Sequence, residues 1–294
     1  MNSKEIKNKN QGILFIIMAG FFFSLMTFFV RMAGDLPTLQ KTFFRNAVAA
    51  VVAIIMLARS PGGFHIKKTS YPSLIFRSLF GCAGMICNFY AIDKLNIADA
   101  NILNKLSPFF AIIASYFLLR EKANKVEWLC VITAFIGAVF VVKPSMNMEF
   151  VYALMGVAGG LGAGIAYAFV RKLGNEGERS IVIVMFFSVF STLVLTPFMI
   201  INFKAMSGMQ ILYMILAGIC AAGGQIGITT AYTKAPAREI SVFDYSQVIF
   251  AAILGMLFLG QFPDWLSITG YIIIVGSAAF KWWYSLKQYK KTEV

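Results

Sequence analysis

Two ionisable residues stand well inside long apolar stretches of this sequence, away from the ends where charged side chains are more common. Lys105 lies within residues 97–119, and Asp244 lies within residues 238–260. A charge near the centre of a bilayer costs at least ~2.5 kcal/mol on insertion scales, so such residues face a bundle interior or a water-filled cavity. We predict that Lys105 contacts an anionic group of a substrate. The alternatives are that it pairs with an acid or extends toward the outer surface.

Pro108 follows Lys105 three residues later and adds a second constraint to the same helical turn. Proline has no N–H, so the carbonyl of Asn104 loses its intrahelical partner. A free carbonyl is tolerated at membrane depth where it is buried in protein or lines a cavity. The charge and the free carbonyl therefore both indicate a cavity at this turn.

Polar residues that could line such a cavity occur around both ionisable residues and in other apolar stretches. The predicted substrate-binding set is Lys105, Asn101, Asn104, Asp244, Tyr245, Ser241, Gln225, Thr229, Asn88 and Arg45. Any one of the neutral members could instead form an interhelical hydrogen bond. Arg77 stays outside the set, because it lies near the end of its apolar stretch, where a long side chain reaches lipid headgroups.

The composition predicts the elements that position these residues. Of 294 residues, 59% are hydrophobic and 13% are charged, and the mean hydropathy is +0.75. These values exclude an ordinary soluble domain. We predict an all-α integral membrane protein with ten transmembrane helices. Their expected ranges are 12–31, 42–58, 72–92, 97–119, 126–142, 150–170, 180–202, 209–230, 238–260 and 265–285.

The ten spans divide the chain into two five-helix units joined by short connections. We predict an N-terminal tail at 1–11, a first repeat at 12–142, an outer linker at 143–149, a second repeat at 150–285 and a C-terminal tail at 286–294. The inner segments carry 17 of the 26 Lys and Arg residues, the outer segments carry 5, and four lie within spans. The positive-inside rule therefore places both tails in the cytoplasm. Topology explains the net charge of +13 better than nucleic-acid binding does.

Cysteine and histidine usage argues against metal and redox chemistry. All four cysteines lie in apolar stretches, and the single histidine, His65, lies in a loop. This pattern lacks the spacing of a zinc site, so we expect no metal, cofactor or disulfide. The sequence also lacks a GxxxxGK[ST] phosphate loop. We expect no enzyme, because clustered histidines, paired carboxylates and an activated nucleophile are missing.

The two halves of the chain show a weak internal similarity. An offset of 140 overlays residues 91–121 on 231–261 with six identities in 31 positions, and it aligns Asn104 with Asp244. An odd number of helices in each unit gives the two units opposite orientations. Inverted repeats with a binding site near the membrane midplane are a recurring plan of secondary transporters.

The inverted arrangement bears on how Lys105 and Asp244 relate. It places Lys105 outside the midplane and Asp244 inside it, so their Cα atoms would differ in depth by roughly 10 Å at about 1.5 Å per residue. This depth argues against a direct ion pair. Three arrangements remain: a gate that makes and breaks the pair, two poles that hold a zwitterion such as an amino acid, and an Asp244 that takes up a proton during transport.

Several short motifs accompany the doubled unit. They are Phe44-Arg45-Asn46 in the second span, Arg77 opening the third, Ser107-Pro108 in the fourth, and Leu119-Arg120-Glu121 at its end. With these motifs the chain resembles the EamA-like ten-helix members of the drug/metabolite transporter superfamily over nearly its whole length. The second copy reads Leu259-Gly260-Gln261 and lacks the acid, so the family's glutamate corresponds to Glu121 alone. The resemblance implies a carrier of small solutes, often metabolites or drugs and often moved outward.

Together these features predict a multi-pass secondary transporter of the plasma membrane that works by alternating access. Its expected substrate is a small carboxylate-bearing or zwitterionic metabolite, with Lys105 in a central cavity. The expected partners are this substrate and the lipid bilayer, with coupling to protons or by exchange, and the assembly is a monomer or a homodimer. Export of cationic or aromatic drugs and translocation of lipids are the alternatives.

Overall fold

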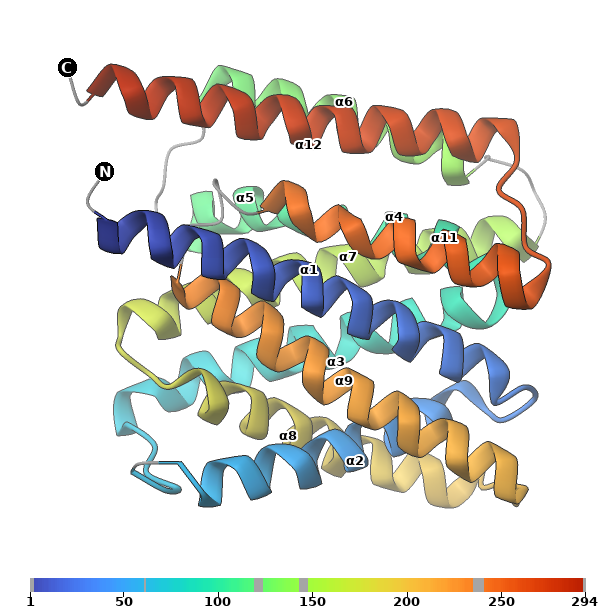
Figure 1. Ribbon diagram of the computed structural model, residues 1–294. Helices are drawn as coiled ribbons and strands as arrows, with labels where there is room; N and C mark the ends of the chain where they lie inside the picture. The colour runs from blue at the N-terminus through green and yellow to red at the C-terminus, as the bar shows by residue number, and fades with distance from the viewer. Residues whose placement is uncertain (1–2, 61, 119–123, 143–147, 235–240, 293–294) are drawn as a thin grey trace.

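A computed structural model describes residues 3–60, 62–118, 124–142, 148–234 and 241–292, and these residues form helices and short connections without a strand (Figure 1). The first half contains α1 (Ser3–Met32), α2 (Thr38–Ala58), the short 3-10 helix η1 (Lys68–Ser70), α3 (Tyr71–Lys94), α4 (Ile97–Asn104), α5 (Ser107–Leu118) and α6 (Lys125–Val142). The second half contains α7 (Met148–Asn175), α8 (Ser180–Ile201), α9 (Gly208–Lys234), η2 (Ser241–Tyr245), α11 (Ser246–Leu259) and α12 (Trp265–Thr292).

The ten-helix membrane fold predicted from hydropathy is confirmed. In the described part of the chain, eight helical segments are long and apolar enough to cross a membrane, and two shorter apolar helices, Trp128–Val141 and Phe243–Leu259, complete the set. The fourth span consists of α4 and α5, and the ninth consists of η2 and α11. Many large apolar side chains on the outer faces are exposed, as lipid-facing residues are.

The predicted limits of the first and last spans differ from the helices. α1 begins at Ser3 rather than at residue 12, and α12 continues to Thr292 rather than ending at 285. Hydropathy marks where a helix leaves the apolar part of the membrane, whereas the helix itself continues through polar residues with good helix propensity. The expected tails are therefore mostly helical extensions of these two spans.

The helices of the two halves make equivalent contacts, so each contact has a counterpart when the halves are interchanged. In this exchange α1 corresponds to α7, α2 to α8, α3 to α9, the α4–α5 segment to η2–α11, and α6 to α12. α1 packs on α9, and its counterpart α7 packs on α3. In the same way, the contact between α5 and α7 corresponds to that between α11 and α1, and the contact between α2 and α9 corresponds to that between α8 and α3. The pairs α2–α8, α4–α11 and α6–α12 join counterparts, and α6 and α12 lie along one edge of the bundle with α2 and α8 along the opposite edge (Figure 1).

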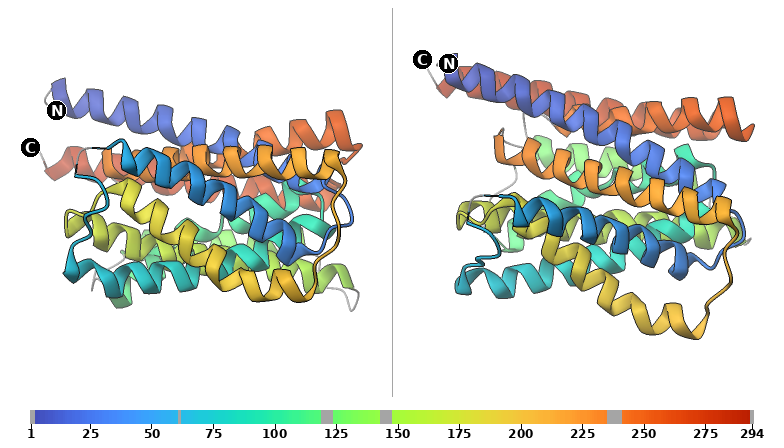
Figure 2. Two further views of the ribbon diagram at one scale, coloured as in Figure 1. Left: turned by 90° about the horizontal axis from the view of Figure 1, so that it is seen from below. Right: turned by 60° about the horizontal axis from the view of Figure 1, so that its bottom comes forward.

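Both chain ends lie at the same end of the bundle, as an even number of spans requires (Figure 2). The connection between α2 and α3 and that between α7 and α8 also lie at this end, whereas the connections after α1 and α8 lie at the other (Figure 1). The end that holds the termini remains the one predicted to face the cytoplasm.

Glycine lets α7 approach two neighbours at once. A methyl group on Gly162 would lie 2.6 Å from the Cα atom of Gly84 on α3. On another side of α7, a methyl group on Gly160 would lie 2.9 Å from the carbonyl oxygen of Leu103, at the end of α4. Both contacts are with backbone, which cannot move aside cheaply. These glycines therefore set how closely α7 packs on α3 and α4.

We predict that Gly84→Ala lowers the stability of the folded protein by about 1–3 kcal/mol, because the added methyl group overpacks the α3–α7 contact. A thermal unfolding assay of the detergent-purified protein measures this change. Gly276→Ala is the matched control, because a methyl group there meets no atom within 4 Å. Equal stability of the two variants would contradict the close contact.

Candidate functional site

The fourth span is interrupted at Lys105. α4 ends at Asn104, Lys105 and Leu106 form a turn, and α5 begins at Ser107. The N–H of Phe109 donates to the carbonyl oxygen of Leu106 at 3.0 Å, so the Lys105 carbonyl is left without an intrahelical partner. Pro108 removes one further donor from this turn. The expected disturbance at Pro108 is therefore a complete break in the helix.

The ninth span changes from a 3-10 helix to an α-helix at the corresponding place. The 3-10 helix η2 ends at Tyr245, and α11 follows directly at Ser246. The offset of 140 between the halves puts Tyr245 opposite Lys105 in the alignment, so the break in the fourth span and this change of helix type occupy equivalent positions. The hydroxyl of Tyr245 donates to the carbonyl oxygen of Lys105 at 3.0 Å. The ninth span thus supplies the donor that the break in the fourth span lacks.

Lys105 and Asp244 form a direct ion pair, which the depth argument had disfavoured. The Nζ atom of Lys105 lies 2.7 Å from Oδ1 of Asp244, and the two residues are 3% and 0% exposed. A difference of that size in depth follows only for two continuous α-helices at about 1.5 Å per residue. The fourth span breaks at Lys105 and the ninth is a 3-10 helix up to Tyr245, so neither condition holds here, and the long lysine side chain covers the remaining distance. Oδ2 of Asp244 is buried and has no hydrogen-bond partner in the described part of the chain.

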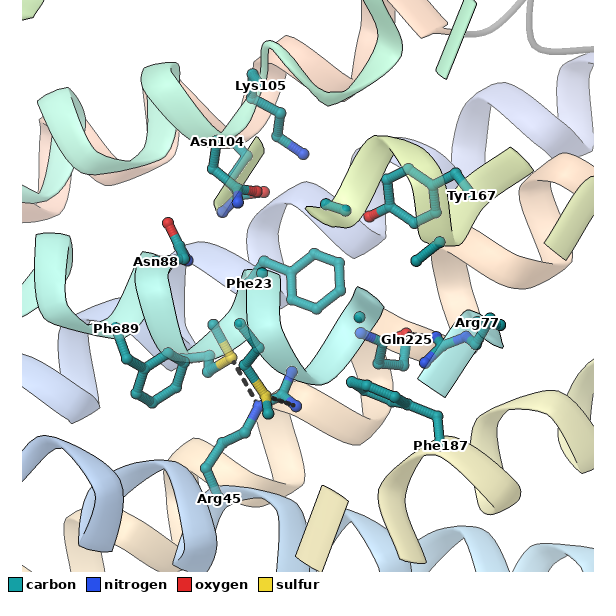
Figure 3. A pocket seen from close by; sticks show the side chains of 17 residues that line it. Phe23, Arg45, Arg77, Asn88, Phe89, Asn104, Lys105, Tyr167, Phe187 and Gln225 are labelled. Carbon is teal, nitrogen blue, oxygen red and sulfur yellow. Dashed lines mark hydrogen bonds between the residues drawn. The ribbon is translucent and has the colours of Figure 1, made fainter. Parts of the chain in front are cut away.

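A cavity lies beside this ion pair in the centre of the bundle (Figure 3). The centre of a water molecule can move within about 90 Å³ of it, which is room for several waters or for the polar end of a small solute. Asn104 and Lys105 enter it from one side and Arg45 from the opposite side, with Phe23 between them (Figure 3). Its lining contains Phe23, Met26, Arg45, Arg77, Gly81, Gly84, Met85, Asn88, Phe89, Asn104, Lys105, Ala163, Ala166, Tyr167, Phe187, Gln225 and Gln247.

The cavity brings together half of the residues predicted to bind substrate. Those in its lining are Arg45, Asn88, Asn104, Lys105 and Gln225. Asp244 and Tyr245 adjoin it through their bonds to Lys105, and Thr229 is buried elsewhere on α9. Ser241 opens η2, and its side chain lies outside the described residues, as does the whole of Glu121.

Asn101 takes part in an interhelical network instead of lining the cavity. Its amide donates to the carbonyl oxygen of Ile97 at 2.6 Å and lies 3.4 Å from Oγ1 of Thr27 on α1. Its Oδ1 atom accepts a hydrogen bond from the Gln247 amide on α11. This network joins α1, α4 and α11 next to the break in the fourth span.

Arg77 is the main site residue that the sequence analysis missed. Its side chain is 3% exposed and lines the cavity, so it does not reach lipid headgroups. The guanidinium lies over the ring of Phe187, 3.7 Å from the ring centroid, and its Nη2 atom lies 3.4 Å from Oε1 of Gln225. Its position indicates this location, because Arg77 lies six residues after the start of α3, more than one helical turn inside the span.

Arg45 enters the cavity from α2 and has only neutral partners. Its Nε atom lies 3.2 Å from the sulfur of Met26, and its Nη1 atom lies 3.4 Å from the sulfur of Met85. Nη1 also donates to Oδ1 of Asn46. Sulfur is a weak acceptor, so these contacts satisfy the guanidinium poorly.

The comparisons with known proteins cover nearly the whole chain. The EamA-like transporter family matches it twice, over residues 10–143 and 150–282. The pseudopaline exporter CntI of Pseudomonas aeruginosa (strain UCBPP-PA14) is 31% identical over 267 residues, which are 90% of this chain and 93% of the exporter. Solute carrier family 35 member G1 of Homo sapiens is 26% identical over 298 residues, which are 94% of this chain and 81% of that protein. The riboflavin transporter of Vibrio cholerae is 26% identical over 279 residues, which are 92% of each chain.

A protein of known crystal structure shares the fold. It superposes with a TM-score of 0.67 over 92% of this chain and 96% of its own, at 17% sequence identity. At that identity the likeness concerns the fold alone.

We predict that the Lys105–Asp244 pair acts as a unit in stability. Lys105→Gln and Asp244→Asn should each cost about 3–5 kcal/mol, because each leaves the other charge buried and unpaired. The double variant should recover most of that loss. Thermal unfolding of the four proteins measures the coupling, and strictly additive losses would show that the two side chains do not depend on each other.

Proposed function

The chain belongs to the EamA-like transporter family, and we propose from that membership that it moves a small carboxylate-bearing or zwitterionic metabolite across the cell membrane by alternating access. The observation that carries this proposal is the buried cavity between the two halves, beside the place where the broken fourth span meets the ninth. Interrupted helices at the interface of inverted repeats form the substrate sites of many secondary transporters.

The charges around the cavity favour an anionic group on the substrate. Arg45, Arg77 and Lys105 line it, and Asp244 beside it is paired with Lys105. A substrate carboxylate can approach Lys105 only by sharing the ammonium group with Asp244 or by displacing the Asp244 carboxylate from it. An ammonium group on the same substrate would then find Oδ2 of Asp244, for which the described residues supply no hydrogen-bond partner. The ion pair thus combines a gate with two poles for a zwitterion.

Alternating access requires each end of the bundle to open in turn. Side-chain hydrogen bonds join the two halves at both ends, and each contributes about 0.5–1.5 kcal/mol net, so a few can break together during transport. At the end away from the termini they join Gln40 to Lys204 and Gln210 to Ala33, and at the other end they join Lys67 to Glu176 and Arg179 to Gly63.

A planar aromatic solute is the second candidate, because aromatic rings line much of the cavity. Phe23, Phe89, Tyr167 and Phe187 contribute these rings. One relative is named a riboflavin transporter and another a pseudopaline exporter, so relatives of similar identity differ in what their names say they carry. A cationic drug fits less well, because two arginines would repel it.

We predict that small carboxylates or amino acids raise the unfolding temperature of the purified wild-type protein, since a ligand of the folded state stabilises it by about 2.7 kcal/mol at 100 times its dissociation constant. Lys105→Met should lose this response. The double variant Lys105→Met with Asp244→Asn serves if the single variant does not fold. Counterflow of the same solutes in proteoliposomes then tests transport.

Lys41→Met is the matched control. Lys41 is also buried and paired with an acid, Asp93, at 2.6 Å, but it does not line the cavity. The control should keep the response to ligand even if it is less stable. Stabilisation of wild type and Lys105→Met alike by cationic or aromatic compounds, with none by carboxylates, would overturn the proposal.

A further inference from the structure

The guanidinium of Arg77 is buried with most of its donors unused. Among the residues that the structure describes, its buried Nε and Nη1 atoms have no hydrogen-bond partner, and Nη2 makes only the 3.4 Å contact with Gln225. The Phe187 ring beneath the guanidinium holds its plane in place. A planar donor group fixed in this way and open to a cavity is suited to a bidentate contact with a carboxylate or a phosphate.

A second guanidinium in the same cavity is also without an acid. Within the part of the chain that the structure describes, neither Arg45 nor Arg77 forms an ion pair. The two acids that form ion pairs there, Asp93 and Asp244, each hold a lysine. The Lys105–Asp244 pair is neutral as a unit, so the two arginines leave the cavity with two uncompensated positive charges.

Two uncompensated charges of like sign in a membrane interior are costly. A buried unpaired charge requires compensation by an ion of opposite sign or by water. A neutral partner such as a methionine sulfur compensates a cation only weakly. The cavity also presents Oδ1 of Asn88, which no described residue contacts by a hydrogen bond and which would accept one from a hydroxyl or an ammonium group of a bound solute.

We propose that Arg45 and Arg77 together bind a small organic dianion, so that the transported solute carries two negative charges on oxygen atoms. This inference rests on the proposed function and names the substrate class of the same cavity. Arg77 makes a bidentate contact with one anionic group. Arg45 gives up its contacts with the methionine sulfurs and binds the second anionic group. The amide oxygen of Gln225, 3.4 Å from Nη2, marks the side of Arg77 from which an anionic oxygen would approach.

The first test separates ligand binding from a structural role. Arg77→Met and Arg45→Met remove a buried charge and keep the side-chain bulk, so the ligand-free variants should unfold at the same temperature as the wild type or higher. Arg59→Met is the matched control, because Arg59 is exposed at the end of α2. Loss of the folded protein in either cavity variant would overturn the proposal, since it would show that the guanidinium is part of the packing.

The second test measures binding with defined probes. Succinate carries two carboxylates, butyrate has the same length with one, and inorganic phosphate supplies a dianion without carboxylates. Succinate should stabilise the wild type at a concentration roughly 10- to 100-fold below that of butyrate, as charge-assisted hydrogen bonds to a second anionic group imply. Arg77→Met and Arg45→Met should abolish that advantage, and Arg59→Met should keep it. Arg77→Lys keeps the charge but not the planar guanidinium, so its affinity for succinate should fall about tenfold.

The outcomes distinguish this inference from the proposed function. If no carboxylate stabilises the wild type, the carboxylate substrate itself is excluded. If butyrate and succinate act alike, or if succinate keeps its advantage in both arginine variants, the carboxylate substrate survives and the dianion is excluded. If phosphate competes with succinate and needs the same two arginines, the dianion stands and phosphoryl compounds join the candidates.

Discussion

The architecture depends on the break in the fourth span at Lys105, which meets the junction of η2 and α11 in the ninth span. Backbone carbonyls cannot be left exposed to lipid, so a broken helix must find its missing partner inside the protein. Here the Tyr245 hydroxyl donates to the carbonyl of Lys105, and the Lys105 ammonium group reaches Asp244. The ninth span therefore supplies partners for both the free carbonyl and the charge of the fourth. The glycines of α7 complete the arrangement, because only a residue without a side chain allows α7 to approach the carbonyls at the end of α4.

The ion pair between Lys105 and Asp244 decides which charges remain available to a substrate. Lys105 was the most conspicuous cation in the sequence, and its ion pair with Asp244 makes it the least available of the three cations around the cavity. Arg45 and Arg77 contact sulfur, amide and aromatic groups instead. The electrostatic character of the cavity is thus set by two arginines that hold no acid, while the lysine–aspartate pair joins the two halves.

Half of the residues that the sequence predicts to bind substrate line the cavity, and the errors of that prediction have a common physical origin. Ten apolar stretches and the offset between the halves were enough to predict the bundle, because hydropathy and chain length constrain membrane helices strongly. The cavity-facing side chain of Arg77 escapes prediction, because position along a span gives a residue's depth but not which face of α3 lies inward. The ion pair was disfavoured because continuous helices were assumed at Lys105 and Asp244, although Pro108 already marked one interruption.

The sequence by itself determined the class of the protein: an all-α membrane bundle with two related halves, since the apolar lengths and their odd number per half admit few other arrangements. It also determined that a cation and an acid lie at membrane depth. Only the tertiary structure decided that these two neutralise each other, that Asn101 serves an interhelical network, and that Arg45 and Arg77 face one cavity. The reason is that ion pairing and the direction of a side chain depend on how each helix is rotated and on where it breaks. Contacts between segments far apart in the chain set both.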